Sequence, residues 1–412
     1  MFTRSSGVQL HITSLPGGRL GPEAYAWVDW LSEAGQSWWQ VLPVGPPDRH
    51  GSPYKSSSAF AAWRGLLEDP KAPVSAEERD AFVEAESAWI GAWAEHGGGR
   101  RAIDDQVRFA REWSALRAHA ADRGVRIIGD VPIYVAPGSA DHLAHPELFR
   151  DDLVAGAPPD AYSDKGQLWG NPFYDWPAMS SRRYAWWTAR LSRTLTLFDA
   201  ARIDHFRGFV AGWAVPAGAR DARGGTWRRG PGRAVFAAAA RELATDGAVL
   251  PFIAEDLGVI TPPVERLRQE LGFPGMVVAQ FAFDPEDAEG PHGLAKHRED
   301  QVAYTGTHDA DTLAGWLEAL PAARRAEVDR ALADGGFSGD DPVWGVTRLW
   351  MTSRCPLVML QAQDILELGT EARMNTPGTA TGNWKWRLEA GALTAEHAAR
   401  LRAATAEAGR VA

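Results

Sequence analysis

Residues 194–209 read TLTLFDAARIDHFRGF, an apolar run that ends in a cluster of charged and titratable side chains. A short apolar run of this kind is typical of a strand buried on both faces, as in a parallel sheet. Arg202 and Asp204 stand two residues apart, so they share one face of that strand. The stretch therefore predicts a buried parallel strand with polar chemistry at its C-terminal end.

Short apolar runs with polar or Gly/Pro endings recur along the whole chain. They are GVQLHITSLP, WWQVLPVGP, RIIGDVPIYVA, LFDAARIDHF, PFIAEDLG, GMVVAQFAF, QVAYTGTHD and PLVMLQAQD. Most are separated by amphipathic stretches such as AYAWVDWLSEAG and SRRYAWWTARLSRTL, whose apolar residues return every three or four positions. Strands alternating with helices in this number predict an α/β fold, a closed parallel (β/α)8 TIM barrel, with an open doubly wound sheet as the alternative. In such a barrel the active site lies at the C-terminal ends of the strands.

The barrel is expected to be a single catalytic domain, residues 1–412, with two insertions at the C-terminal face of the strands. The first is a subdomain at 49–101 after the second strand, where Ser75 and Glu78 form a capping-box pattern. The second, at 137–177 after the third strand, contains GAPPDAYSDKGQLWGNPFYDW. This segment is too long and too aromatic for a simple connector, so it predicts a substrate-binding loop.

Composition limits the partners and the compartment. The 412 residues carry a formal net charge of −10, without a basic block that would follow a nucleic-acid backbone. No stretch reaches the roughly 18 apolar residues that a membrane-spanning helix needs. The single cysteine, Cys355, lies in the apolar run CPLVML, which predicts a buried, inert thiol rather than a nucleophile. We therefore expect a cytoplasmic protein that binds neither nucleic acid nor membrane.

The 19 tryptophans have two interpretations. Trp27 and Trp30 stand at helical spacing in AYAWVDWL, which favours a place in the core. Trp169, Trp384 and Trp386 stand in segments rich in glycine and proline, where stacking on a ligand and packing in the core both remain open.

Carboxylates follow three of the expected strands. Asp204 comes after ARI, Glu255 and Asp256 come after FIA, and Asp309 comes after TGTH. A lone acid in such a place is usually a helix cap or a salt-bridge partner. Three at one barrel mouth would crowd like charges, which raises at least one pKa toward the value that a general acid needs.

The bases around these carboxylates favour a division of roles. Arg202 can hold Asp204 ionised, which makes Asp204 the expected nucleophile and Glu255 the expected proton donor. Two carboxyls about 5 to 5.5 Å apart, with aromatic rings nearby, would form a retaining glycosidase site. His11, His205 and His308 have no metal-ligand spacing, so neither a metal nor another cofactor is expected.

Ten segments follow one another along nearly the whole chain in an order that resembles a known family. They are RSSGVQLHITSLPG, LSEAGQSWWQVLPVGP, SPYKSSSAF, GDVPIYVA, GQLWGNPFYDW, RIDHFRGF, AEDLG, GFPGM, TGTHDADT and ARMNTPGTATGNWKWR. They resemble the 4-alpha-glucanotransferases of glycoside hydrolase family 77, the amylomaltases or disproportionating enzymes. The resemblance implies a barrel related to that of the α-amylases.

The resemblance also implies the reaction. Such an enzyme transfers α-1,4-glucan segments from a maltooligosaccharide or amylose to the 4-hydroxyl of an acceptor glucan or glucose, through a covalent glucosyl-aspartate. By resemblance Asp204 is the nucleophile, Glu255 the acid/base and Asp309 the acid that stabilises the transition state. The implied sugar-contacting residues are Tyr54, Asp130, Gln167, Trp169, Arg202, Asp284, His308 and Asn375.

The chain departs from the family's usual pattern in two regions. The segment between Tyr54 and Asp130 is shorter than usual, and AAWRGLL within it replaces the usual Asn-Pro before paired leucines. Ala161 precedes Tyr162 where two adjacent aromatic residues are usual, so one stacking ring fewer is expected for a bound glucan.

Two other functions use the same residues. A hydrolase would let water take the acceptor's place, and its catalytic carboxylates would be the same. A glucan-binding or scaffold protein without turnover would be expected to lack one of the carboxylates, and Asp204, Glu255 and Asp309 are all present.

Overall fold

The computed structural model describes residues 2–159, 163–243, 249–283, 290–337, 339–379 and 381–411. Eight parallel strands form one sheet in the order β10-β11-β12-β1-β2-β3-β6-β9. Their bounds are β1 Ser5–Gln9, β2 Trp38–Gln40, β3 Arg126–Val131, β6 Ala200–Ile203, β9 Phe252–Ala254, β10 Gly275–Val278, β11 Gln301–Tyr304 and β12 Leu357–Gln361. Seven of the eight apolar runs predicted as strands contain one of these strands in full, and GVQLHITSLP contains the last three residues of β1.

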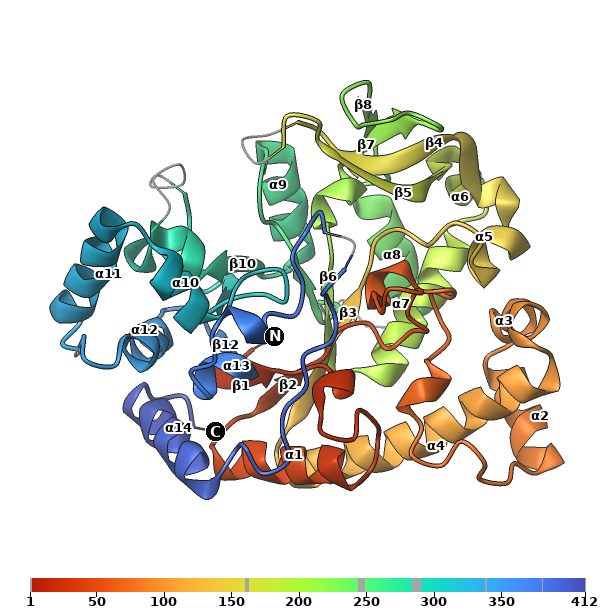
Figure 1. Cartoon of the computed structure of the whole chain (residues 1–412). Helices are drawn as coiled ribbons and strands as arrows, with labels where there is room; N and C mark the ends of the chain where they lie inside the picture. The colour runs from red at the N-terminus through yellow and green to blue at the C-terminus, as the bar shows by residue number, and fades with distance from the viewer. Residues whose placement is uncertain are drawn as a thin grey trace. The chain divides into compact units, whose positions relative to one another are not determined.

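The strand order is that of a barrel. Except for β9 and β10, which stand at the two ends of the order, strands of this sheet that follow one another in the chain are neighbours. The last strand, β12, pairs in parallel with the first, β1, from Ser5↔Leu357 to Gln9↔Gln361. Figure 1 shows β1 between β12 and β2. A doubly wound open sheet would instead reverse its order at a central strand. The pairing of β12 with β1 therefore favours the predicted (β/α)8 barrel.

Helices separate most of the strands. They are α1 Pro22–Glu33, α2 Ala76–Ala85, α3 Ile90–Gly97, α4 Arg100–Asp122, α5 Ala140–Ala144, α6 Trp176–Ser181, α7 Ala185–Leu197, α8 Arg233–Glu242, α9 Pro262–Leu271, α10 Leu313–Ala319, α11 Ala322–Asp334, α12 Pro342–Met351, α13 Ala362–Ile365 and α14 Ala395–Glu407. Trp27 and Trp30 on α1 are buried and their rings stack at 5.3 Å, which confirms their predicted place in the core. No helix within the described ranges is long and apolar enough to cross a membrane.

The chain divides into two compact units. The first comprises Met1–Leu42, Ser114–Ile128 and Pro274–Ala412, and the second comprises Pro43–Trp113 and Gly129–Phe273. In the first unit Cys355 is fully buried, and burial raises the pKa of its thiol, as predicted for an inert cysteine. The core of the second unit is rich in aromatic side chains, which include Phe206 and Trp187.

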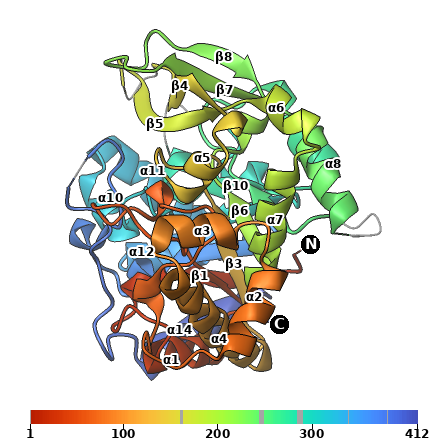
Figure 2. The ribbon, with the colours of Figure 1, turned by 90° about the vertical axis from the view of Figure 1, so that its right-hand side faces the viewer.

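The second unit contains an antiparallel sheet that the sequence analysis did not predict. Its strand order is β5-β4-β7-β8, coloured yellow to green in Figure 2. The strands are β4 Phe149–Ala157, β5 Gln167–Tyr174, β7 Ala211–Pro216 and β8 Thr226–Arg229.

Within this sheet, residues 167–174 form a strand, so the prediction of one continuous loop from GAPPDAYSDKGQLWGNPFYDW is wrong for this part. Gly170 has a positive φ of 77° and Pro172 cannot donate a backbone hydrogen bond, which hides the strand in the sequence. Both are tolerated because β5 lies at the edge of the sheet and its pairing with β4 is irregular.

The predicted insertion at 49–101 contains α2, α3 and the start of α4. Ser75 caps α2 with the expected capping box, since its hydroxyl accepts from the N–H of Glu78 while the Glu78 carboxylate accepts from the N–H of Ser75. Gly98 and Gly99 both have positive φ angles in the exposed turn between α3 and α4. These glycines give the chain the left-handed conformation that it needs in this turn.

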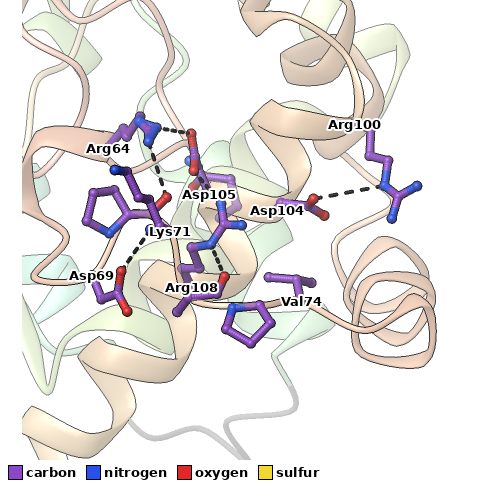
Figure 3. A network of polar contacts seen from close by, with 12 residues as sticks. Arg64, Asp69, Lys71, Val74, Arg100, Asp104, Asp105 and Arg108 are labelled. Atoms are coloured by element: carbon purple, nitrogen blue, oxygen red, sulfur yellow. Dashed lines mark hydrogen bonds and ion pairs between the residues drawn. The ribbon is translucent and has the colours of Figure 1, made fainter.

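Charged side chains on α4 hold the segment before α2 (Figure 3). Asp105 is buried and accepts from Arg108 Nη1 at 2.7 Å and from Arg64 Nη1 at 3.3 Å. Arg108 Nε donates to the carbonyl of Ala72, and Arg64 Nη2 donates to that of Pro70. One carboxylate thus orients two guanidinium groups that bind the carbonyls of residues 70–72.

We predict that Asp105→Asn destabilises the insertion. An amide cannot balance two guanidinium charges, and breaking a buried ion pair costs about 3 to 5 kcal/mol. Thermal denaturation should show a lower Tm, and hydrogen exchange at residues 64–72 should accelerate.

The matched control is Asp329→Asn, which breaks the exposed pair with Arg325 and should change stability by less than about 0.5 kcal/mol. Equal effects of the two substitutions would contradict this account of the Asp105 network.

Candidate active site

Two predicted catalytic carboxylates follow neighbouring parallel strands of the second unit. Asp204 comes directly after β6 and Glu255 directly after β9. The N–H of Asp204 donates to the carbonyl of Val131, and the N–H of Glu255 donates to that of Ile203, both at 3.0 Å. The parallel ladder therefore extends one residue beyond each strand and fixes the backbone of both acids.

Arg202 lies between two carboxylates. Its Nη2 donates to Asp204 Oδ1 at 2.7 Å, while Nη1 donates to Asp130 Oδ1 and Oδ2 at 2.9 and 2.7 Å. Burial alone would lower the pKa of Arg202, but Asp130 and Asp204 raise it well above its ordinary value. The predicted pairing of Arg202 with Asp204 is confirmed, and Arg202 stays charged beside it.

Asp130 connects this group to Tyr54. The Tyr54 hydroxyl donates to Asp130 Oδ2 at 2.7 Å. Both residues line a cavity of the second unit, together with Pro132, Tyr134 and Arg190. The structure thus brings Tyr54, Asp130, Arg202 and Asp204 together.

Glu255 accepts two backbone hydrogen bonds. The N–H of His205 donates to Oε2 at 2.7 Å and the N–H of Leu257 donates to Oε1 at 2.8 Å. Burial raises the pKa of Glu255 to about 7; Arg202 opposes this shift and the negative charge of Asp204 adds to it. Glu255 is therefore a carboxyl that can both hold and release a proton near neutral pH.

The backbone of His205 is unusual. His205 has a φ of 50°, in the left-handed region that residues other than glycine rarely adopt. This conformation accompanies the hydrogen bond from its N–H to Glu255. Burial lowers the pKa of the His205 imidazole to about 4, so the ring is neutral near pH 7.

Trp169 on β5 contacts both His205 and Gln167. The Trp169 ring meets the His205 ring edge to face at 4.7 Å, and its Nε1 donates to Gln167 Oε1 at 3.0 Å. Trp169 is half-buried, so part of its ring stays exposed.

Asp256 does not belong to this set. The sequence places it among the carboxylates that follow the expected strands, but its Oδ2 lies 3.1 Å from Arg268 Nε. Arg268 on α9 is almost fully buried, and a buried guanidinium requires a counter-charge. Asp256 is therefore a salt-bridge partner rather than a candidate for catalysis.

Asp309 lies in the first unit, in the loop after β11. Its Oδ1 accepts from Asn375 Nδ2 at 2.6 Å and lies 3.3 Å from His308 Nε2. The N–H of Asn375 donates to the carbonyl of His308, and Arg373 Nη2 donates to that of Asp309. The Asp309 side chain is 45% exposed, so it is held in place and still open to a ligand.

Of the remaining predicted residues, the structure describes some and leaves others outside the described ranges. Asp284, like Ala161 and Tyr162, lies outside the described residues. Trp384 has a positive φ of 63°, and its ring lies 5.9 Å from that of His308. Trp386 lines a small cavity of the first unit with His11 and His308. These contacts are compatible with both ligand stacking and core packing.

The site can do acid–base and nucleophilic chemistry with protein groups. Within the described ranges, no cluster of three or more His, Cys, Asp or Glu residues is placed to hold a metal ion. Arg373 and Asp364 contact the loop of Asp309, but the sequence analysis did not name them. The signal available for Asp364 was its place directly after the strand run PLVMLQAQ.

Comparisons with known proteins identify the family. The sequence profile of glycoside hydrolase family 77, described as 4-alpha-glucanotransferase, matches residues 10–94 and 104–394. A 4-alpha-glucanotransferase of Thermus thermophilus is 40% identical over 493 aligned positions, which cover 97% of this chain and 98% of that protein. Since the alignment is longer than the 412 residues of this chain, the relative has residues without a counterpart here.

The comparison with solved structures agrees with the comparison of sequences. An amylomaltase from Streptococcus agalactiae in complex with acarbose matches 99% of this chain and 100% of its own, with a TM-score of 0.90 and 30% identity. An α-amylase from Anoxybacillus has a TM-score of 0.59 at 10% identity, covering 99% and 79% of the two chains, and shares the fold alone. The fold is the predicted (β/α)8 barrel, and the chain belongs to the 4-alpha-glucanotransferases of glycoside hydrolase family 77.

Proposed function

We propose that this protein transfers α-1,4-glucan segments by a retaining double displacement through a covalent glucosyl-Asp204. The donor is a maltooligosaccharide or amylose, and the acceptor is the 4-hydroxyl of a glucan or glucose. The observation that carries the proposal is the pair of Asp204, bound to Arg202, and Glu255, whose pKa burial raises to about 7. The proposed compartment is the cytoplasm.

Asp204 acts as the nucleophile. Its carboxylate is held by the ion pair with Arg202, and it can attack the anomeric carbon. The side chain is 29% exposed, so its second oxygen can reach a substrate while Oδ1 is bound to Arg202. Attack forms an ester bond between Asp204 and the sugar as the bond to the leaving glucan breaks.

Glu255 acts first as the acid and then as the base. Its protonated form gives a proton to the glycosidic oxygen of the leaving glucan. The resulting carboxylate accepts hydrogen bonds from the N–H groups of His205 and Leu257. It then takes the proton of the acceptor hydroxyl, whose oxygen attacks the anomeric carbon, releases the Asp204 carboxylate and restores the original configuration.

Asp309 stabilises positive charge at the reacting sugar. Its partly exposed carboxylate near sugar hydroxyls would matter most as the oxocarbenium-like transition state develops. The proposed sugar-contacting residues are Tyr54, Asp130, Gln167, Trp169, Arg202, Asp284, His308 and Asn375. Their support is the family membership and, for those described, their contacts with one another.

The shortened segment after Tyr54 has support from the family match. That match is interrupted at residues 95–103, where α3 gives way to α4. The residues that the longer relative has in excess are therefore proposed to lie in this region, with Asp204 and Glu255 outside it.

Incubation with maltotriose tests transfer against hydrolysis. We expect glucose together with a ladder of longer oligosaccharides, because an acceptor glucan takes the place of water. Chromatography of the products over time provides the measurement. Glucose and maltose alone would identify a hydrolase, and unchanged maltotriose would indicate a binding protein.

The pH dependence of kcat/KM tests the role of Glu255. The acid must be protonated for the first step, so kcat/KM for maltotriose should fall as pH rises above about 7, by about tenfold per unit. Maltotriosyl fluoride loses fluoride without a proton, so its kcat/KM should stay level there. The same alkaline decline with both donors would contradict the assignment of Glu255 as the acid.

A further inference from the structure

The loop at residues 305–313 of the first unit carries His308 and Asp309, and one carboxylate holds both of its ends. Asp364 Oδ2 accepts from Thr305 Oγ1 at 2.8 Å. Asp364 Oδ1 accepts from the N–H of Leu313, at the start of α10, also at 2.8 Å. Asp364 itself lies on the short helix α13 after β12 and is 2% exposed.

Residues that follow Asp364 in the chain contact the middle of the same loop, between its two ends. Thr370 Oγ1 donates to Asp311 Oδ2 at 2.9 Å. Further along, Arg373 donates to the carbonyl of Asp309, and Asn375 donates to its carboxylate. Residues 364–375 therefore bind the loop from its first residue to its last.

The loop also packs closely against two glutamines. Gln280 Nε2 donates to the carbonyl of Asp311 at 2.7 Å. A Cβ added at Gly306 would meet the side-chain amides of Gln361 and Gln280, which would have to move to make room for it. Such packing limits how the loop can adjust when a contact at its ends is lost.

We propose that Asp364 is a positioning residue for Asp309: by binding Thr305 and Leu313 it fixes the loop that presents the Asp309 carboxylate to the sugar. The proposal rests on the catalytic role proposed above for Asp309. A misplacement of about 1 Å in a catalytic group can cost about a hundredfold in rate, so an anchor that touches no substrate can still control kcat.

The chemistry of the two donors explains why the anchor is a carboxylate. The Thr305 hydroxyl and the Leu313 N–H each need an acceptor, and a carboxylate offers one oxygen to each. An asparagine would turn an NH2 group toward one of these donors. Burial and, to a smaller extent, the negative charge of Asp311 raise the pKa of Asp364 to about 7, whereas the hydrogen bonds from Leu313 and Thr305 act to lower it.

Asp364→Asn and Thr305→Val disrupt the same hydrogen bond from its two sides. Each should lower kcat for maltotriose transfer about tenfold or more, while the Kd for acarbose changes less than about threefold. Hydrogen exchange should accelerate at residues 305–313. The control is Asp105→Asn, another buried aspartate, which should lower Tm and leave kcat unchanged at a temperature where every variant is folded.

A double-mutant cycle with Asp309→Asn shows whether Asp364 acts through Asp309. In the Asp309→Asn background, adding Asp364→Asn should change kcat by less than about twofold. A full additional loss there would overturn the proposal, as would a wild-type kcat in both Asp364→Asn and Thr305→Val. If Asp364→Asn fails to fold, Thr305→Val carries the same comparison.

The cycle also separates the two claims. A wild-type kcat in Asp309→Asn would remove the catalytic role of Asp309 itself, and with it the proposal for Asp364. A large loss in Asp309→Asn combined with no loss in the Asp364 and Thr305 variants would leave that role intact and overturn the positioning role alone.

Discussion

The guanidinium of Arg202, between Asp130 and Asp204, is the interaction on which the proposed chemistry depends. A buried charge is costly, and the two carboxylates offset that cost with three hydrogen bonds of 2.7 to 2.9 Å. The same contacts orient Asp204 and connect it through Asp130 to Tyr54. Removing Arg202 would therefore leave two carboxylates without their counter-charge, and one of them is the proposed nucleophile.

Among the described residues, two acids have pKa values raised to about 7, and their surroundings differ. Burial raises the pKa of both Glu255 and Asp364, and each carboxyl accepts hydrogen bonds at both of its oxygens. Glu255 is bound by two backbone N–H groups beside Asp204, where a group that exchanges a proton is useful. Asp364 accepts one hydrogen bond from each of the two ends of one loop, and its two oxygens thereby hold that loop in place. A raised pKa alone therefore does not identify a catalytic acid, because the groups that surround it determine what it can do.

Local patterns predicted much of this structure. Apolar runs predicted all eight barrel strands, and the polar residues after them predicted Asp204, Glu255 and Asp309 as candidates. The antiparallel sheet was missed because β4 pairs with β7, which lies far along the chain. Asp364 was missed for the same reason, since Thr305 and Leu313 lie 59 and 51 residues from it. The acid is visible in the sequence, but its partners are not.

Mass spectrometry of a trapped intermediate tests the central claim, that Asp204 becomes glycosylated. In Glu255→Gln, maltotriosyl fluoride can still react with Asp204 because fluoride leaves without a proton, but no base activates the acceptor. The account predicts one added maltotriosyl group, located by peptide sequencing at Asp204. An adduct on a different carboxylate, or near-normal transfer by Asp204→Asn, would contradict it.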